Sequence, residues 1–176
     1  MRRKAKTANF GIIYGISSFG LAQRLNIPRT EASDLIKEYF KEFPAVKAYM
    51  DSCIEKARED EYVTTMLGRR RYLRDINSRN PTQSGFAERN AVNAPIQGTA
   101  ADMIKIAMVR IHHYLKEEKL ATRMILQVHD ELVFDAPRHE VEIIKGPVIK
   151  HMQEALLLKV PIEVGFGIGE NWLEAH

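Results

Sequence analysis

The fold class of this chain is decided by the stretch Arg123-Met124-Ile125-Leu126-Gln127-Val128-His129-Asp130-Glu131-Leu132-Val133-Phe134-Asp135. Its two apolar halves, 123–128 and 131–135, have the composition of central strands, and only two residues separate them. We therefore expect an antiparallel hairpin with His129 and Asp130 at its turn. The segments around it have mostly helical apolar spacing, so the predicted class is α+β, with many helices and a small antiparallel sheet.

We expect two lobes along the chain. The first, residues 1–84, is predicted to be helical over about 2–14, 19–25, 29–42 and 44–60, with a hairpin near 62–73. The second, residues 85–176, begins with a long helix over about 85–118 that Pro95 and Gly98 are expected to interrupt. After the central hairpin we expect a helix over 141–158, kinked at Gly146-Pro147, and a last strand over 160–168.

The composition narrows the class of protein. Of the 176 residues, 45% are apolar and 28% are charged, a balance typical of globular rather than disordered chains. No run of about eighteen apolar residues exists, which excludes a membrane-spanning helix. The single cysteine, Cys53, excludes a disulfide framework and a cysteine-based zinc site, so a reducing compartment is expected.

The basic residues are unevenly distributed. A net charge of +3 is too small to imply an anionic partner, but basic side chains gather at 2–6 and 69–74. Either cluster alone is typical of a solvated surface, whereas two in one chain favour a polyanionic ligand. The first cluster starts at residue 2 without an N-cap residue, which indicates a chain that begins inside a helix of a longer protein.

Four side chains of the first helix recur at every fourth position: Arg2, Lys6, Phe10 and Tyr14. Each step turns the helix by about 40°, so they form a slowly winding stripe about 18 Å long, comparable with an extended nucleoside triphosphate. The cations would meet phosphates at one end, and the rings a base and a sugar at the other. Alternatively, the rings face a core and the cations face water, and spacing alone does not decide between these readings.

Two adjacent carboxylates, Asp130 and Glu131, lie at the turn of the expected central hairpin. Exposed and rigidly held there, they would suit a hard cation such as Mg²⁺. The alternative is ordinary turn chemistry, in which Asp is common. His129 has no second histidine at ligand spacing, so it gives no metal signal by itself.

A third pattern lies in the long helix. Arg89, Asn93 and Gln97 are spaced by four, and small residues between them would allow close backbone approach. Hydrogen-bonding side chains of this kind suit the minor groove of DNA, where acceptors occupy nearly the same positions in every sequence. Alternatively, they hold two lobes of the protein together.

These three segments together resemble the bacterial family A DNA polymerases. The stretch similar to the family's motif B is Arg2-Arg3-Lys4-Ala5-Lys6-Thr7-Ala8-Asn9-Phe10-Gly11-Ile12-Ile13-Tyr14-Gly15, and the stretch similar to motif C is Gln127-Val128-His129-Asp130-Glu131. Further matches are Thr65-Met66-Leu67-Gly68-Arg69-Arg70-Arg71, residues 93–101 and Gly169-Glu170-Asn171-Trp172. The resemblance covers essentially the whole chain. It implies that 1–84 correspond to most of the fingers and 85–176 to the rear of the palm.

The resemblance implies a role for each candidate residue in template-directed DNA synthesis. The residues implied to contact the incoming deoxynucleoside triphosphate are Arg2, Lys6, Phe10, Tyr14 and His129. Lys6 is also the implied proton donor to the leaving pyrophosphate. The residues implied to touch the minor groove of primer–template DNA are Arg89, Asn93 and Gln97. Asp130 is the implied ligand in a site for two Mg²⁺ ions, with Glu131 in a supporting role.

The sequence departs from the family pattern because one expected segment is absent from it. The family's other metal-binding carboxylate lies in an upstream segment, motif A, that residues 1–176 do not contain. We therefore expect a C-terminal part of a cytoplasmic polymerase, inactive or nearly so in isolation, with primer–template DNA and deoxynucleoside triphosphates as partners. Surface left uncovered is expected to favour self-association. The alternatives are a non-catalytic nucleic-acid-binding module and a helical interaction domain.

Overall fold

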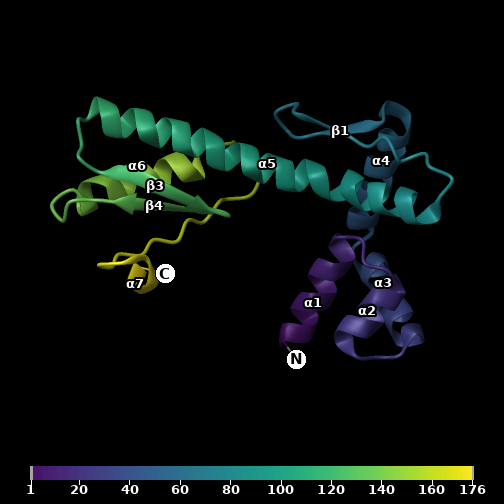
Figure 1. Ribbon diagram of the computed structural model, residues 1–176. Coiled ribbons are helices and arrows are strands. Elements are labelled where there is room, and N and C mark those ends of the chain that lie inside the picture. Colours follow the sequence, from purple (N-terminus) through teal and green to yellow (C-terminus); the bar gives the residue numbers. More distant parts are fainter. Residues whose placement is uncertain (1, 176) are drawn as a thin grey trace. The chain divides into compact units, whose positions relative to one another are not determined.

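The computed structural model of the protein describes residues 2–175, and the side chains of residues 5–175. The chain forms two compact units, Met1–Thr99 and Ala100–His176, and each is described by itself. Figure 1 shows helices together with two small antiparallel sheets, which confirms the α+β prediction. The division of the chain into lobes at 84/85 rests on the resemblance and stays a prediction.

The first unit contains short helices, a hairpin and the start of a long helix. Their bounds are α1 (Arg2–Ile13), α2 (Ser18–Leu25), α3 (Arg29–Glu42), α4 (Pro44–Asp60), β1 (Tyr62–Thr64), β2 (Arg70–Tyr72) and α5 (Pro81–Glu117). Local chemistry explains the boundaries. Gly15 and Asn26 follow α1 and α2 with φ of 74° and 55°, and Pro44 begins α4. The predicted helices over 29–42 and 44–60 are confirmed.

The described residues of the first unit form two hydrophobic clusters. One joins α1 to α2 and α3 and consists of Ile12, Leu21, Ala22, Leu25 and Ala32. The other joins α4 and the β1–β2 hairpin to α5 and consists of Ala57, Val63, Leu73, Ile76, Ala87, Ala91 and Ala94. Helix α1 and the β1–β2 hairpin are therefore each anchored by a core of their own.

Helix α5 runs without interruption through Pro95 and Gly98, so the expected break is wrong. A proline inside a helix removes one backbone donor. Here Ala91 and Ala94 are buried in the second cluster just before it, and the Thr99 hydroxyl donates to the Pro95 carbonyl oxygen at 2.6 Å. Burial on both sides of the proline outweighs one missing hydrogen bond.

Length does not make α5 a membrane helix. It has 37 residues, but Glu88, Arg89 and Lys105 are among the charged residues along it. Within the part of the chain that the structure describes, no helix is both long and apolar enough to cross a membrane.

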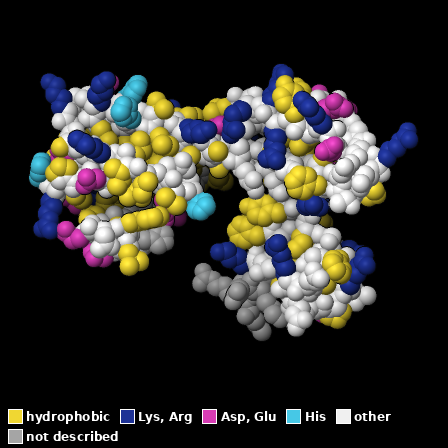
Figure 2. All heavy atoms as spheres, in the orientation of Figure 1, with side chains coloured by type: hydrophobic (Ala, Val, Ile, Leu, Met, Phe, Trp, Pro, Cys, Tyr) yellow, Lys and Arg dark blue, Asp and Glu magenta, His cyan; other side chains and the backbone are white. Residues whose placement is uncertain are grey.

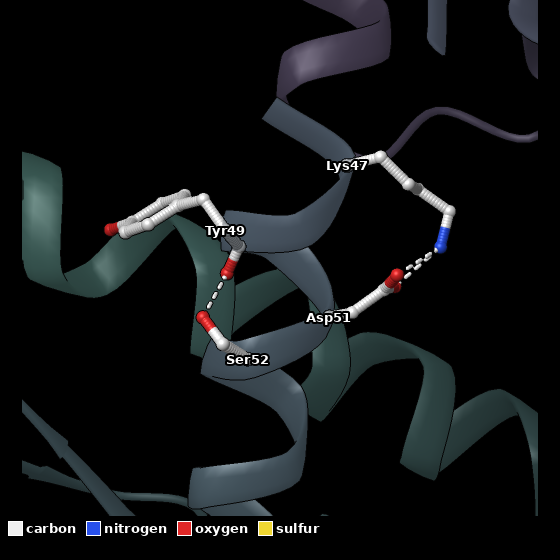
Figure 3. Close-up of polar contacts among 4 residues, drawn as sticks. All are labelled: Lys47, Tyr49, Asp51 and Ser52. Carbon is white, nitrogen blue, oxygen red and sulfur yellow. Dashed lines mark hydrogen bonds and ion pairs between the residues drawn. The ribbon is translucent and has the colours of Figure 1, made fainter. Parts of the chain in front are cut away.

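Helix α4 carries polar contacts of its own (Figure 3). Lys47 binds Asp51 one turn later, and the Ser52 hydroxyl donates to the Tyr49 carbonyl oxygen at 2.8 Å. The Tyr49 ring projects from the opposite side of the helix to the Lys47–Asp51 pair. Burial, together with a hydrogen bond to Cys53, raises the pKa of Tyr49 to about 12. All five residues belong to α4, so these contacts stabilise that helix itself.

The second unit is a two-stranded hairpin covered by helices on one face. Its strands are β3 (Arg123–Val128) and β4 (Glu131–Asp135), followed by α6 (Val141–Gln153) and α7 (Trp172–Ala175). A cluster between α5, α6 and β4 consists of Ala107, Ile111, Leu115, Ile144, Val148 and Ala155, with Leu132 and Phe134 packed against it. The predicted hairpin 123–135 is confirmed, with its turn at His129 and Asp130.

The two strands of this hairpin carry an irregularity. Met124 is opposite Phe134 and Leu126 is opposite Val133, so Ile125 is an extra residue in β3. Such a bulge reverses the alternation of side chains along the strand. Met124 and Gln127 consequently share the helix-covered face with Leu132 and Phe134, and Leu126 lies on the other face.

The segment after α6 departs from expectation. Residues 160–168 are not a strand, although we expected one, and α6 ends at Gln153 rather than near 158. Pro161 lacks a backbone donor, and Gly165 and Gly167 have low strand propensity, so this segment is a poor partner for a ladder. It is instead held by side chains: Arg138 pairs with Glu170 at 2.6 Å, and Lys145 lies 5.2 Å from the Phe166 ring centroid.

Candidate functional site

Helix α1 presents the predicted stripe to solvent. The Lys6 ammonium lies 5.8 Å from the centre of the Phe10 ring, and the Phe10 and Tyr14 ring centres are 6.2 Å apart. Both rings are exposed, at 47% and 42%. The reading in which these rings face a core is therefore wrong. The side chain of Arg2, the fourth member of the stripe, lies outside the described residues.

An open pocket of about 1000 Å³ extends from this stripe to α5. Helix α5 contributes Phe86, Arg89, Asn90 and Asn93, and the α1–α2 turn contributes Gly15, Ile16 and Ser17. The pocket lies wholly within the first unit. Its volume is at the upper end of the range typical of small-molecule sites. The structure thus brings Lys6, Phe10 and Tyr14 together with Arg89 and Asn93.

Gly15, just after α1, lies close to Arg89 of α5. Its φ is 74°, which L-amino acids rarely adopt, and a Cβ there would lie 3.1 Å from the Cγ of Arg89. The Arg89 guanidinium carbon is 5.8 Å from the Phe86 ring centre. The stem of Arg89 is thus held between Gly15 and the aromatic ring one turn before it, with its charge at the pocket.

The pocket is positively charged. It is lined by Lys6, Arg24 and Arg89, and none of the described residues that line it is Asp or Glu. The Asn93 Oδ1 atom is buried and has no partner within the described structure. A concave surface with cations of one sign attracts anions, and an unpartnered carboxamide oxygen can accept a hydrogen bond from a ligand.

Gln97 lies one turn further along α5, in a separate pocket of about 80 Å³ beside the β1–β2 hairpin. Arg69, Arg70 and Arg71 line that pocket too. The Arg69 guanidinium donates to the Gly98 carbonyl oxygen at 2.9 Å, which ties the hairpin to α5. Gln97 therefore does not share the larger pocket, but it continues the same helix beyond Asn93.

The two hairpin arginines that follow Arg69 carry exposed charge. Arg70 stacks on the Tyr62 ring with its guanidinium carbon 4.6 Å from the ring centre. Neither Arg70 nor Arg71 has an ion-pair partner among the residues that the structure covers. This basic cluster therefore forms an exposed cationic edge next to Gln97.

The turn of the β3–β4 hairpin belongs to the second unit. His129 has a φ of 55°, and its carbonyl oxygen accepts a 2.7 Å hydrogen bond from the Gln127 side chain. A positive φ is uncommon for residues with a Cβ, so His129 holds a backbone conformation that glycine and asparagine adopt at lower cost. Asp130 is exposed, and Glu131 is half-buried at the start of β4.

The donor chemistry of this turn suits a hard cation, but the turn alone does not form a closed metal site. Carboxylate oxygens are the ligands that Mg²⁺ prefers. Within the described part of the chain, no three His, Cys, Asp or Glu side chains gather as a ligand set. The exposed Asp130 carboxylate therefore has no second and third ligand gathered around it among the described residues.

Glu140 fixes the two residues that precede β3. Its carboxylate accepts hydrogen bonds from the Ala121 N–H at 2.9 Å, the Thr122 N–H at 2.8 Å and the Thr122 hydroxyl at 2.5 Å. Glu140 is only 6% exposed. The Thr122 hydroxyl, followed by the Ala121 N–H, lowers the pKa of Glu140 below its ordinary value.

The sequence analysis missed several residues of the larger pocket. Phe86 and Asn90 lie three positions before Arg89 and Asn93 on α5. The i, i+3 spacing, which also places side chains on one face of a helix, would have found them. Arg24 has no such signal, because it reaches the pocket only through the packing of α2 against α1.

Comparison with known proteins identifies the class to which this fold and pocket belong. A family model described as DNA polymerase family A matches residues 1–174. The chain therefore belongs to DNA polymerase family A.

The relatives are bacterial proteins. The chain is 53% identical over 175 residues to DNA polymerase I of Bacillus caldotenax and 50% identical to DNA polymerase I of Bacillus subtilis. In both comparisons the match covers 99% of this chain and 20% of the relative, so the chain spans about a fifth of the length of these curated relatives.

A solved structure is also similar. It is described as the POL domain of Pol1 from M. smegmatis in complex with DNA primer-template and dNTP. The TM-score is 0.95 at 44% identity, and the match covers 99% of this chain and 31% of that one.

Proposed function

We propose that this chain is the nucleotide-binding part of a template-directed DNA polymerase. The longer protein would add deoxynucleotides to a primer 3′ end, in the cytoplasm, during replication and repair. The observation that carries the proposal is the larger pocket, which is lined by Lys6 and Phe10 of α1, Tyr14 just after it, and Arg89 and Asn93 of α5. Family membership and a relative solved with primer–template and dNTP support it.

Different pocket residues would bind different parts of the nucleotide. Lys6, with Arg2, would bind the triphosphate, while Phe10 and Tyr14 would contact the sugar and base. Lys6 would also give a proton to the leaving pyrophosphate. Because the pocket is cationic, a polyanionic nucleotide would gain free energy on entering it.

The second unit would supply the metal-binding end of the reaction. Asp130 would hold Mg²⁺ together with a carboxylate outside residues 1–176, and Glu131 would support it. Two such ions, when bound, activate the primer 3′-oxygen and neutralise the leaving group. His129 would lie near the primer end and the incoming phosphates. A single carboxylate is too few for this site, so the isolated chain would bind substrates without turning them over.

Helix α5 would contact the product duplex. Arg89, Asn93 and Gln97 would lie along the minor groove, where hydrogen-bond acceptors are nearly independent of sequence. A polymerase has to tolerate every sequence, and minor-groove contacts suit that need. The exposed Arg70 and Arg71 favour a rival function, a nucleic-acid-binding module without catalysis.

Binding of dTTP to the isolated chain tests the pocket. We expect Lys6→Ala to weaken binding at least about tenfold, because a charge-assisted hydrogen bond to phosphate is lost. Lys41→Ala is the matched control, since Lys41 lies on α3 outside the pocket and contacts Glu38 at 3.6 Å. Isothermal titration calorimetry measures both. Equal affinity of the wild-type chain and Lys6→Ala would contradict the proposed role of the pocket.

Primer extension tests whether the metal site needs a carboxylate outside residues 1–176 in addition to Asp130. We expect extension with Mg²⁺ and all four deoxynucleotides only from a longer polypeptide that includes the upstream carboxylate, and loss of that extension in its Asp130→Asn variant. Extension by the 176-residue chain would mean that a second carboxylate lies within it. The rival binding module instead predicts salt-sensitive DNA binding that depends neither on Asp130 nor on Mg²⁺.

A further inference from the structure

A side-chain hydrogen bond links α1 to α3. The Tyr39 hydroxyl donates to the Asn9 Oδ1 atom at 2.9 Å, across thirty residues of sequence. Neither residue lines the larger pocket, although Asn9 lies on the same helix as Lys6 and Phe10. The hydrogen bond between Tyr39 and Asn9 can therefore orient α1, but the two side chains do not contact a ligand in the pocket.

Helix geometry places Asn9 on the flank of α1. With about 100° per residue, Ala8 and Ile12 share one face, and Lys6, Phe10 and Tyr14 lie on roughly the opposite face. The first face packs on the α1–α3 cluster, and the second lines the pocket. Asn9 is about 60° from Ile12 and about 60° from Lys6, so it lies midway between the buried and the pocket-facing sides.

Packing alone restrains the rotation of α1 weakly. On its buried face Ala8 is small, and Ile12 is the large side chain of α1 in the cluster. A helix side chain ends about 5–6 Å from the axis, so a roll of about 20° would move it by about 2 Å. Displacements of about 1 Å can cost two orders of magnitude in a site that depends on positioning.

Tyr39 is well placed to restrain that roll. Its ring packs against Phe40 and Phe43, with ring centres 5.7 and 5.0 Å away, and against the same cluster that holds Ile12. The hydroxyl is therefore a donor at a fixed point on α3. A hydrogen bond from that point to the flank of α1 opposes rotation in either direction.

We propose that Tyr39 is a positioning residue for nucleotide binding, whose hydrogen bond to Asn9 fixes the rotation of α1 and so aims Lys6 and Phe10 into the pocket. This inference rests on the proposed function. It adds to that function a residue on α3 that acts on the substrate only through α1.

The test is a double-mutant cycle in the 176-residue chain, read out as dTTP affinity by calorimetry. Tyr39→Phe keeps the ring and removes the hydroxyl, and Asn9→Ala removes the acceptor. We expect each change to weaken dTTP binding about three- to tenfold, the range of one hydrogen bond, and the double variant to be no weaker than either single one. Affinity for duplex DNA, bound through α5, should stay within about twofold.

Tyr49→Phe is the matched control, because Tyr49 lies on α4 and its hydrogen bond goes to Cys53 of the same helix. It should bind dTTP as the wild-type chain does. If Lys6→Ala weakens binding while Tyr39→Phe does not, the inference is overturned and the proposed function stands. If the chain does not bind dTTP, or if Lys6→Ala has no effect, both are overturned. Additive losses in the double variant would also overturn the inference, since the two residues would then act separately.

Discussion

Glu140 is a buried charged residue of the second unit. Its carboxylate is nearly buried, and three donors from Ala121 and Thr122 satisfy it. These donors favour the ionised form, so the pKa of Glu140 in the folded protein lies below the value of about 4.3 expected in the unfolded chain. Stability from this group is therefore fully present above the unfolded pKa and is lost as pH falls through the folded pKa.

We expect Glu140→Gln to lower the melting temperature at pH 7 and to have progressively less effect below pH 4. The amide retains one acceptor and places an NH₂ group against donors, whereas in acid the wild-type carboxyl is itself neutral. Thermal unfolding of both proteins across pH 3–8, followed by circular dichroism, measures the difference. Glu142→Gln is the control, because Glu142 is exposed in the first turn of α6. A constant difference at all pH values would contradict the assignment.

Several of the pocket residues could be predicted from the sequence, and the others could not. Lys6, Phe10 and Tyr14 could be predicted to share a face because one helix fixes their spacing, and the same holds for Arg89 and Asn93. Sequence spacing within a helix does not say which other helix will face it. Arg24 reaches the pocket through the packing of α2 against α1, and Tyr39 contacts Asn9 of α1 from α3. The sequence offers no local pattern for either contact.

Helix α5 contains two glycines, Gly85 and Gly98, whose surroundings differ. A Cβ at Gly98 would lie 2.6 Å from the Thr65 Cγ2 atom in the hairpin, whereas a Cβ at Gly85 would meet only an Arg89 nitrogen, at 4.0 Å. The Met66 N–H donates to the Thr99 hydroxyl oxygen at 3.0 Å close by. The β1–β2 hairpin thus lies directly on the helix surface at Gly98.

We expect Gly98→Ala to lower the free energy of unfolding by about 1–3 kcal/mol, because the hairpin must shift to make room. Gly85→Ala, the same substitution in the same helix, should raise it by about 0.5–1 kcal/mol through helix propensity. Urea denaturation of the two variants tests the pair. Equal changes in the free energy of unfolding for the two variants would show that contact with Thr65 does not limit the size of the side chain at residue 98.

The elements that the sequence predicted well are those whose ends are marked by a proline or a short turn. Pro28 and Pro44 mark the starts of α3 and α4, and the short turn between β3 and β4 fixes that hairpin. The two errors have different causes. Pro95 does not end α5 because the buried Ala91 and Ala94 before it and the buried Thr99 after it hold the helix. Residues 160–168 form no strand because Pro161, Gly165 and Gly167 disfavour one.

At the scale of the whole molecule, the second unit leaves apolar surface uncovered. Because of the bulge, Leu126 lies on the face away from α5 and α6, and Ile125 beside it is 53% exposed. Figure 2 shows hydrophobic side chains at the surface over β3 and β4. Both strands also have an edge without a partner in the described structure. Unpaired edges beside apolar surface promote association between molecules.

We expect the 176-residue chain to self-associate at micromolar concentration in sedimentation velocity experiments. Leu126→Lys should shift it toward the monomer, because a charge would then lie on the uncovered face of the sheet. Leu157→Lys is the matched control: Leu157 is 94% exposed but lies outside the hairpin, so the same change there should have little effect. A wild-type chain that sediments as a monomer at these concentrations would disprove the expectation.

The backbone conformation at His129 is unfavourable for a residue with a Cβ. Its φ of 55° would be relieved by glycine or asparagine, which adopt that conformation at lower cost. Laboratory evolution that rewards survival at high temperature alone would therefore drift toward those residues. Selection for DNA synthesis would retain the imidazole if it acts near the primer end. Selection for heat resistance alone and selection for DNA synthesis should therefore yield different residues at position 129 from the same starting gene.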